Sequence, residues 1–271
     1  MKRGKQETAS QPGECSAERI HSGVPGLDDM LHGGYMPCTA NLVEGAPGCG
    51  KSTLGMQFIH EGALHGEPGI ILTFEQFPEH YYRDAAAFGW DFHSLEQRGL
   101  VKIIMSSPEV CKADLQRSDG KIGQLISKMK AKRILVESLS HFERISSNPL
   151  ILRNLTYSFI NALKREGLTA VLTRESHVLL GDDREEEESE GSFSFLVDSY
   201  LMLRYIEIES AIQRAVILLK MRGSAHDTHI RQFEIGAQGM YIQEPFRGRE
   251  GLMSGSPRQM AESFVKAFVR R

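Results

Sequence analysis

One nine-residue loop constrains this chain more than any other feature. Gly45–Thr53 (GAPGCGKST) fits the pattern G-x-x-x-x-G-K-[ST], follows the apolar strand candidate Ala40–Glu44 and leads into the helix candidate Lys51–Leu64. The glycines allow a tight turn in which amide groups converge on a phosphate, and the helix N-terminus adds partial positive charge. The loop therefore predicts a nucleotide-phosphate site; the alternative is a glycine-rich turn before an unrelated helix.

The residues of this loop have separate expected roles. Lys51 would reach the β- and γ-phosphates of a nucleoside triphosphate, and the Ser52 hydroxyl would be a ligand of Mg²⁺. The predicted ligands are therefore ATP and Mg²⁺. The whole loop is expected to bind the nucleotide: Gly45, Ala46, Pro47, Gly48, Cys49, Gly50, Lys51, Ser52 and Thr53.

Two further strand candidates end in carboxylates. Arg133–Glu137 is an apolar strand whose last residue would help to hold Mg²⁺, although this position is usually Asp and Glu137 is one methylene longer. Glu75 follows the strand Gly69–Phe74 and would orient or deprotonate an attacking water. The alternative for Glu137 is a buried strand that ends in a surface glutamate. The alternative for Glu75 is an ordinary strand-end residue.

The order of apolar and amphipathic segments predicts the fold. Strand candidates are Ala40–Glu44, Gly69–Phe74, Leu100–Met105, Arg133–Glu137 and Leu168–Thr173. Helix candidates between or after them are Lys51–Leu64, Glu79–Phe88, Lys121–Lys130 and Leu150–Arg165. Later stretches have the spacing of hairpins: Leu196–Ile208, Ala215–Met221, Arg231–Ile235 and Met240–Gln243. We predict an α/β fold, a mostly parallel twisted sheet flanked by helices and extended by antiparallel C-terminal hairpins.

The chain is expected to contain one domain. It would occupy residues 19–246, between a flexible polar arm at residues 1–18 and a C-terminal loop and tail at residues 247–271. In the tail, Met260, Phe264 and Phe268 are four residues apart, which predicts a basic amphipathic helix over Gln259–Arg271. Such a helix either docks on a partner or packs on its own domain.

Composition excludes several classes of protein. The net charge of −3 argues against a strongly basic nucleic-acid binder, and 41% hydrophobic with 25% charged residues is typical of soluble proteins. No segment approaches the roughly 20 apolar residues that span a bilayer. Residues 1–14 are polar and lack the apolar region of a secretory signal. We therefore expect a cytoplasmic protein with no membrane contact.

Six further motifs lie along the chain: Ser22–Gly34 (SGVPGLDDMLHGG), Thr73–Phe77 (TFEQF), Phe88–Phe92 (FGWDF), Lys220–Asp227 (KMRGSAHD), Pro245–Arg247 (PFR) and Ser254–Pro257 (SGSP). Together with the loop, they resemble the KaiC family of RecA-like ATPases. The resemblance runs from about Ile20 to Gln259, nearly the whole chain, and is more specific than any one motif. KaiC proteins have two such domains in tandem, and the likeness here is to the second.

The resemblance implies a RecA-like P-loop core and a homo-oligomeric ring, usually a hexamer, with ATP between neighbouring subunits. By position, Glu75 would be the catalytic carboxylate and Glu137 the acid of the second nucleotide motif. Lys220 and Arg222 would approach the γ-phosphate of the neighbour's ATP, as arginine fingers do. The alternative for these two cations is a solvated hairpin end. The tail would recruit a regulatory protein.

Two departures from the family pattern matter. Gln76 stands where the family often has a second glutamate, and a neutral amide positions water but is no base, so hydrolysis would be slow and rest on Glu75. The family's Ser-Thr phosphoacceptor pair falls on Ser194-Phe195, with Ser192 nearby. Ser194 is therefore a candidate acceptor for serine autokinase activity; the alternative is a plain strand-edge serine.

Other functions compete with a slow ATPase that acts as a regulatory switch. A RadA-like DNA-repair ATPase would bind DNA through the loop that here carries the acidic run Asp182–Glu190, which would repel DNA. The second alternative is a scaffold that binds nucleotide without hydrolysis. Dispersed histidines predict no metal site: His141, His177 and His226. A basic cluster is expected to be solvated surface: Lys128, Lys130, Lys132 and Arg133.

Overall fold

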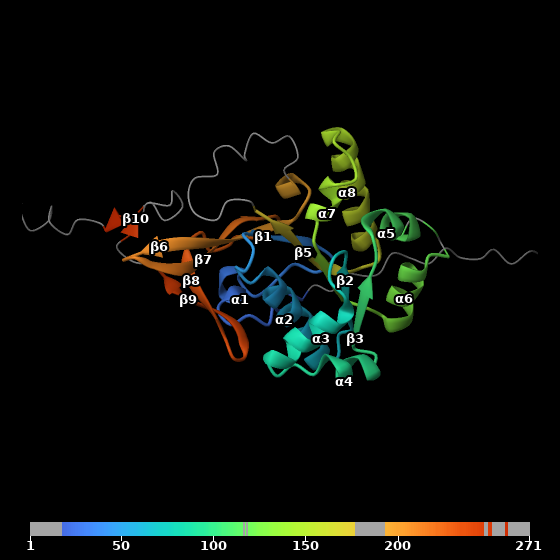
Figure 1. Cartoon of the computed structure of the whole chain (residues 1–271), viewed down its shortest axis with the longest axis horizontal. Helices are drawn as coiled ribbons and strands as arrows, with labels where there is room; N and C mark the ends of the chain where they lie inside the picture. The colour runs from blue at the N-terminus through green and yellow to red at the C-terminus, as the bar shows by residue number, and fades with distance from the viewer. Residues whose placement is uncertain are drawn as a thin grey trace, which may run out of the picture.

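A nine-stranded sheet runs through the computed structural model of the chain (Figure 1). The structure describes residues 18–115, 117, 119–176, 193–246, 249–250 and 258–259. Strands lie in the order β3-β2-β4-β5-β1-β6-β7-β8-β9. The pairs from β3 to β6 are parallel, and those from β6 to β9 are antiparallel. The predicted α/β fold, a mostly parallel sheet with C-terminal hairpins, is confirmed.

The elements have the following bounds. The strands are β1 (Ala40–Gly45), β2 (Gly69–Thr73), β3 (Val101–Met105), β4 (Arg133–Glu137), β5 (Thr169–Glu175), β6 (Ser199–Ile208), β7 (Ala211–Met221), β8 (Arg231–Gly236), β9 (Gly239–Pro245), β10 (Arg249–Glu250) and β11 (Arg258–Gln259). The helices are α1 (Leu27–Met30), α2 (Lys51–Leu64), α3 (Pro78–Ala87), α4 (Phe92–Gln97), α5 (Pro108–Leu115), α6 (Lys121–Met129), α7 (Ser140–Glu143), α8 (Pro149–Arg165) and the 3₁₀ helix η1 (Phe193–Phe195).

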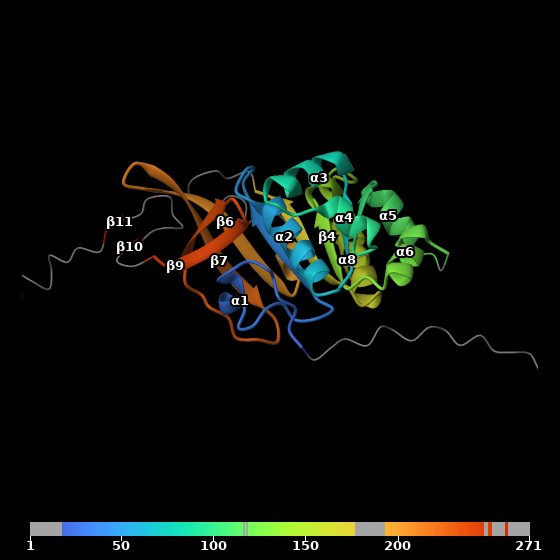
Figure 2. The same cartoon turned by 90° about the horizontal axis from the view of Figure 1, so that it is seen from below.

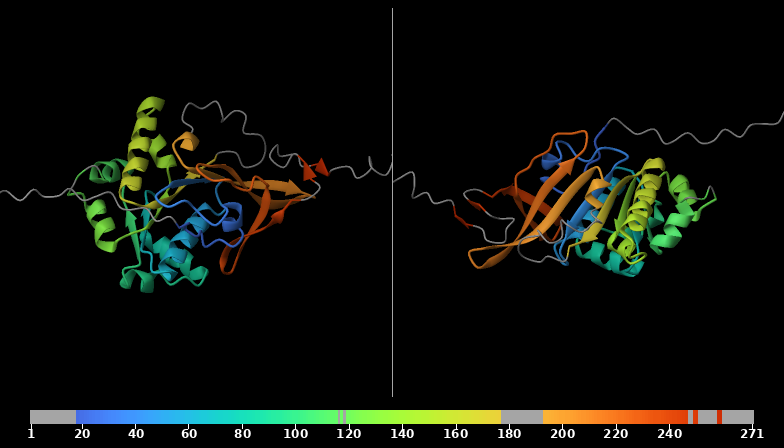
Figure 3. Two further views of the ribbon diagram at one scale, coloured as in Figure 1. Left: turned by 180° about the vertical axis from the view of Figure 1, so that it is seen from behind. Right: turned by 90° about the horizontal axis from the view of Figure 1, so that it is seen from above.

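Helices cover the two faces of the parallel part of the sheet. Successive residues of β1 point to opposite faces, so Val43 packs with α1 to α4 and Leu42 packs with α5 to α8. Figure 2 looks onto the first layer, and the right-hand view of Figure 3 looks onto the second. Both β1 and β2 are buried along their whole length. Among the described residues, no helix combines the length and hydrophobicity that crossing a membrane requires.

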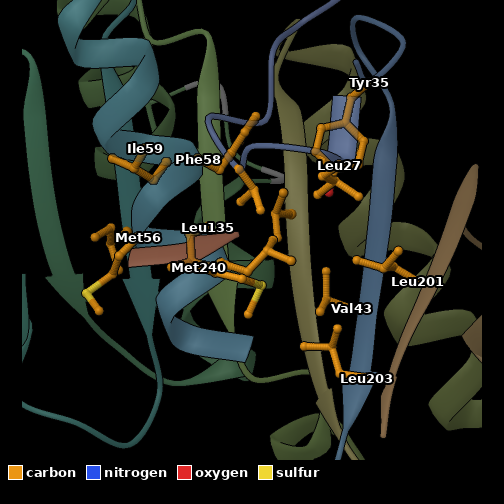
Figure 4. Packing of buried hydrophobic residues seen from close by; sticks show 14 of the residues in the cluster. Leu27, Tyr35, Val43, Met56, Phe58, Ile59, Leu135, Leu201, Leu203 and Met240 are labelled. Atoms are coloured by element: carbon orange, nitrogen blue, oxygen red, sulfur yellow. The ribbon is translucent and has the colours of Figure 1, made fainter. Parts of the chain in front are cut away.

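Helix α2 lies very close to the sheet because small residues face it. A Cβ atom on Gly55 would come within 2.4 Å of Leu135 Cδ1, so a larger residue at this contact with β4 would have to displace the leucine side chain. Figure 4 shows Leu135 among the buried side chains of this layer, with Met56, Phe58 and Ile59 of α2 around it. This close packing fixes the direction in which the N-terminus of α2 points.

The buried Gln57 joins α2 to two distant segments. Its Nε2 donates to the carbonyl oxygens of Gly23 (2.6 Å) and Met240 (3.1 Å), and its Oε1 accepts from the Met240 amide (2.8 Å). A buried amide side chain is stable when its polar atoms are paired in this way. Gln57 thereby holds the β8–β9 hairpin and the N-terminal segment against α2.

Some predicted boundaries are wrong, and local geometry explains them. β6 begins at Ser199 and not at Leu196, because Asp198 pairs with Ala40 and the preceding residues form η1. β7 begins at Ala211 and not at Ala215, because Glu209 and Ser210 adopt positive φ and make a tight two-residue turn without glycine. Periodicity does not predict the short helices α1, α4, α5 and α7, since they contain too few turns to show it.

The termini and the acidic run are largely outside the described residues. These include the predicted arm up to residue 17, the run Asp182–Glu190, and the tail from residue 260 onward. Gln259 itself lies in β11, which pairs with β10, so the predicted tail helix does not begin at that residue. The helix over the remaining tail stays a prediction.

The expectation that Arg133 is solvated surface is wrong. Its side chain is 3% exposed and makes an ion pair with Glu67 (Nη2–Oε2, 2.6 Å). Nη1 also donates to the carbonyl oxygens of His21 (2.7 Å) and Phe58 (3.0 Å), and the guanidinium lies 4.7 Å from the Phe58 ring centroid. Gly62 leaves room for it, since a Cβ there would come within 2.4 Å of Arg133 Cδ. The first residue of β4 is therefore part of the core.

Replacing Arg133 by methionine tests this structural role. Arg133→Met keeps the apolar stem but leaves two carbonyls and Glu67 without their donor, so it should lower the free energy of unfolding by about 3 kcal/mol. The matched control is the exposed neighbour in Lys132→Met, which should change it by less than about 0.5 kcal/mol. Urea denaturation followed by circular dichroism measures both. Equal effects of the two substitutions would contradict the buried role.

Candidate functional site

The glycine-rich loop lies at the carboxyl end of β1, as predicted. β1 ends at Gly45, level with Glu175 of β5 and Leu203 of β6, and α2 begins at Lys51. Gly50 has a φ of 103°, and a Cβ there would come within 2.6 Å of Ile235 Cδ1. Glycine is therefore favoured where the chain enters the helix.

Lys51 lies over this loop. Its Nζ donates to the carbonyl oxygens of Gly45 (2.8 Å) and Ala46 (3.0 Å), and the residue is 8% exposed. The first turn of α2 contains no acidic residue, so its positive N-terminal end is not neutralised locally. Neutral carbonyls bind an ammonium group more weakly than a phosphate does. The arrangement suits an anion that would replace these carbonyls as the partner of Lys51.

Glu137 is not the surface glutamate of the alternative interpretation. It ends β4, accepts a hydrogen bond from the Ser52 hydroxyl at Oε1, and accepts another from Tyr81 Oη at Oε2 (2.7 Å). The pKa of Glu137 is raised, because the effect of burial outweighs the lowering effects of the hydrogen bonds from Ser52 and Tyr81 and of the Lys51 charge. A hydroxyl and a carboxylate are thus in contact at the end of β4, and Mg²⁺ prefers oxygen ligands of these kinds.

Mg²⁺ would need further ligands at this place. Among the residues that the structure describes, no group of three or more histidine, cysteine or acidic side chains is arranged to hold a metal ion. At nucleotide sites, Mg²⁺ usually takes one or two ligands from the protein and the rest from phosphate and water. Here the two protein oxygens would come from Ser52 and Glu137. The residues present therefore fit a Mg²⁺ ion that arrives with the nucleotide.

Glu75 lies at the same edge of the sheet, beyond the end of β2. Thr73 of β2 is level with Glu137 of β4, and the Phe74 amide donates to the Glu137 carbonyl oxygen (2.9 Å). The Thr73 hydroxyl accepts from the amides of Gln76 (3.1 Å) and Glu75 (3.4 Å), which fixes the turn. The Glu75 side chain is 66% exposed. It therefore faces solvent next to the predicted nucleotide site.

His141 belongs to this edge, although its sequence position did not predict a role. Its Nε2 is 3.2 Å from Glu75 Oε2, and its ring packs edge-on against Phe74 with centroids 6.2 Å apart. The position of His141, four residues after the end of β4, is a sequence signal for this place, because the carboxyl ends of parallel strands meet at one edge. Two other histidines were named with His141 in the sequence. His226 lies within the residues that the structure describes, and His177 lies outside them.

Lys220 and Arg222 lie at the opposite edge. Met221 is level with Ser199, which is level with Asn41 of β1, so these cations are roughly 13 Å along the strands from Gly45. They cannot contact the loop of their own chain. This position leaves open only a role toward another molecule or a role within the local turn.

Both cations hold the turn formed by η1. Lys220 Nζ donates to the carbonyl oxygens of Ser194 and Val197 (2.8 Å each), and Arg222 Nη2 donates to that of Phe195 (2.8 Å). Burial lowers the pKa of Lys220. Neither residue is thus a simple solvated hairpin end. Ser194 lies within η1 and not at a strand edge, while Ser192 is outside the described residues.

Comparisons with known proteins agree with this geometry. The family described as "ATPase: KaiC" matches residues 20–247. Relatives include "Circadian clock protein KaiC3" of Synechocystis sp., 33% identical over 92% of this chain and 48% of the relative. "Circadian clock oscillator protein KaiC" is 35% identical in Picosynechococcus sp., over 91% and 46%, and 36% identical in Rippkaea orientalis, over 89% and 45%.

This chain spans about half the length of the relatives it matches. Their overall activities therefore do not transfer to it directly. The family match, in contrast, covers both strand-end carboxylates and the cations of β7, and the sheet order and mixed strand directions are those of a RecA-like α/β fold. The chain belongs to the KaiC ATPase family.

Proposed function

We propose that the chain binds ATP with Mg²⁺ at the Gly45–Thr53 loop, hydrolyses it slowly, and acts as a regulatory or signalling switch. The observation that carries the proposal is the convergence of Lys51, Ser52 and Glu137 at the carboxyl edge of the sheet. The relatives are named as circadian clock proteins, which supports a switch over a metabolic role. We expect this function in the cytoplasm.

Each group would have a defined part in hydrolysis. The loop amides and Lys51 would hold the phosphates, and Ser52 with Glu137 would hold Mg²⁺. The metal ion supplies neutralisation of phosphate charge when it is bound. Glu75, with one oxygen near His141, would accept a proton from the attacking water or orient it. Gln76 is exposed and cannot replace it as a base.

Substitution at Glu75 separates catalysis from binding. Glu75→Gln should bind ATP as well as the wild type and hydrolyse it roughly 100-fold more slowly, since it removes a base and not a phosphate contact. Lys51→Ala should lose nucleotide binding. Equilibrium dialysis measures binding, and phosphate release measures turnover. In the matched variant Gln76→Glu, ATP turnover should still depend on Glu75, so adding Glu75→Gln to it should remove that turnover. Unchanged turnover in Glu75→Gln would remove the assignment of Glu75.

We further propose that ATP lies between subunits of a homo-oligomeric ring, with a hexamer as the expected size. Lys220 and Arg222 support this, because they cannot contact their own loop yet lie next to each other at the opposite edge. In a head-to-tail ring, the edge of one subunit that carries Lys220 and Arg222 would meet the Gly45–Thr53 loop of the next subunit. The cations would exchange neutral carbonyl partners for a phosphate, which is a stronger acceptor.

Mixing two inactive variants tests this arrangement. Arg222→Ala subunits keep an intact loop, and Lys51→Ala subunits keep an intact Arg222, so a mixed ring contains complete interfaces. Each variant alone should be at least roughly tenfold slower than the wild type, and the mixture should regain part of the turnover. Size measurement by light scattering, with and without ATP, shows whether mixed rings form. Mixed rings without recovery would contradict a role for Arg222 across the interface.

The autokinase part of the proposal concerns Ser194. Its carbonyl is held by Lys220, one of the two cations proposed to meet the neighbour's γ-phosphate, so phosphate and acceptor would be near each other. After incubation with Mg-ATP, mass spectrometry should find a phosphate on Ser194 in the wild type and none in Ser194→Ala or Lys51→Ala. An unmodified wild type at both Ser192 and Ser194 would exclude the kinase activity.

The proposed partners follow from the same picture. Copies of this chain would meet at the nucleotide sites, and a regulatory protein would bind the C-terminal tail at residues 247–271, in which Met260, Phe264 and Phe268 have helical spacing beside basic residues. Nucleic acid is not among the proposed partners, because the net charge is −3 and the acidic run would repel it.

A further inference from the structure

Tyr81 makes a contact in the site that no motif predicts. It lies one turn into α3, is 2% exposed, and donates its hydroxyl to Glu137 Oε2 at 2.7 Å. The Ser52 hydroxyl occupies the other oxygen, Oε1. Among the described residues, these two hydroxyls are the side-chain hydrogen-bond donors to the Glu137 carboxylate. Each carboxylate oxygen therefore has its own partner from a different element.

The length of Glu137 makes this second partner necessary. A glutamate has one more rotatable bond than an aspartate, and its terminal torsion is broad and weakly constrained. With only Ser52 bound, the carboxylate would be free to rotate about that contact. A hydrogen bond at Oε2, from a ring fixed by burial, removes this freedom and leaves Oε1 beside Ser52.

We propose that Tyr81 is a positioning residue for the Mg²⁺ site, acting through Glu137. The inference rests on the proposed function, because it assigns the Ser52–Glu137 pair to Mg²⁺. Removing a side chain that hydrogen-bonds a metal-binding carboxylate commonly lowers the metal affinity by about 10- to 100-fold. Tyr81 has the geometry of such a partner, since it touches the carboxylate oxygen that does not face Ser52.

Mg²⁺-dependent binding of a fluorescent ADP analogue tests the proposal without measuring turnover. Tyr81→Phe removes only the hydroxyl. We expect it to raise roughly tenfold the Mg²⁺ concentration at which the strengthening of ADP-analogue binding is half-maximal. Binding in EDTA should equal that of the wild type. The matched control is Tyr82→Phe, which removes a hydroxyl that bonds Glu96, between α3 and α4 and away from Ser52, and should behave as the wild type.

A second variant shows whether Tyr81 acts through Glu137. Glu137→Asp shortens the side chain and withdraws it from the Tyr81 hydroxyl. Tyr81→Phe should therefore weaken the Mg²⁺ response strongly in the wild type and by less than roughly threefold in the Glu137→Asp background, because contacting residues are not additive. Equal effects in the two backgrounds would overturn the positioning role.

The remaining outcomes are distinct. If Tyr81→Phe weakens ADP binding equally in EDTA and in Mg²⁺, the hydroxyl has a general structural role and the proposal is wrong. An unchanged Mg²⁺ response in Tyr81→Phe, with a clear response in the wild type, overturns this inference and leaves the proposed function intact. Wild-type protein that binds no ADP would overturn the proposed function and this inference with it.

Discussion

The close contact between α2 and the sheet is the constraint on which the site depends. Gly55 and Gly62 have no side chain where Leu135 and Arg133 of β4 press against the helix, so α2 lies low across the sheet. Because α2 begins at the end of β1 and packs on β4, its first turn points toward the end of β4. Ser52 and Glu137 meet for that reason, although 85 positions separate them in the chain.

The two edges of the sheet divide the chemistry between them. Parallel strands bring Gly45, Glu75 and Glu137 to the carboxyl edge, where the phosphates, the metal ion and the attacking water would meet. The antiparallel return of β7 carries Lys220 and Arg222 to the other edge. A chain built in this way holds two incomplete halves of the proposed site. This separation is the physical reason to expect an assembly in which each site is completed by a neighbour.

Local sequence patterns predict the parts of the site whose determinants lie close together in the chain. The loop, its flanking strand and helix, and the strand-end carboxylates depend on short patterns, and the structure places them together. Remote contacts leave no such pattern: Arg133 is buried because Glu67, Phe58 and His21 surround it, and none of them is near it in the sequence. The contact of Tyr81 depends on the rotation of α3 about its axis, which the sequence does not specify.

The unequal fixation of the two carboxylates explains why slow turnover is expected. Glu137 is partly buried and hydrogen-bonded at both oxygens, so the metal side of the proposed site is organised before a nucleotide arrives. Glu75 is 66% exposed and touches only His141 among its described side-chain partners, so packing does not fix its direction. A water molecule held by such a group is poorly oriented, and rate is lost when orientation is lost. Slow chemistry of this kind would keep the proposed nucleotide-bound state long-lived, which is the property that a switch requires.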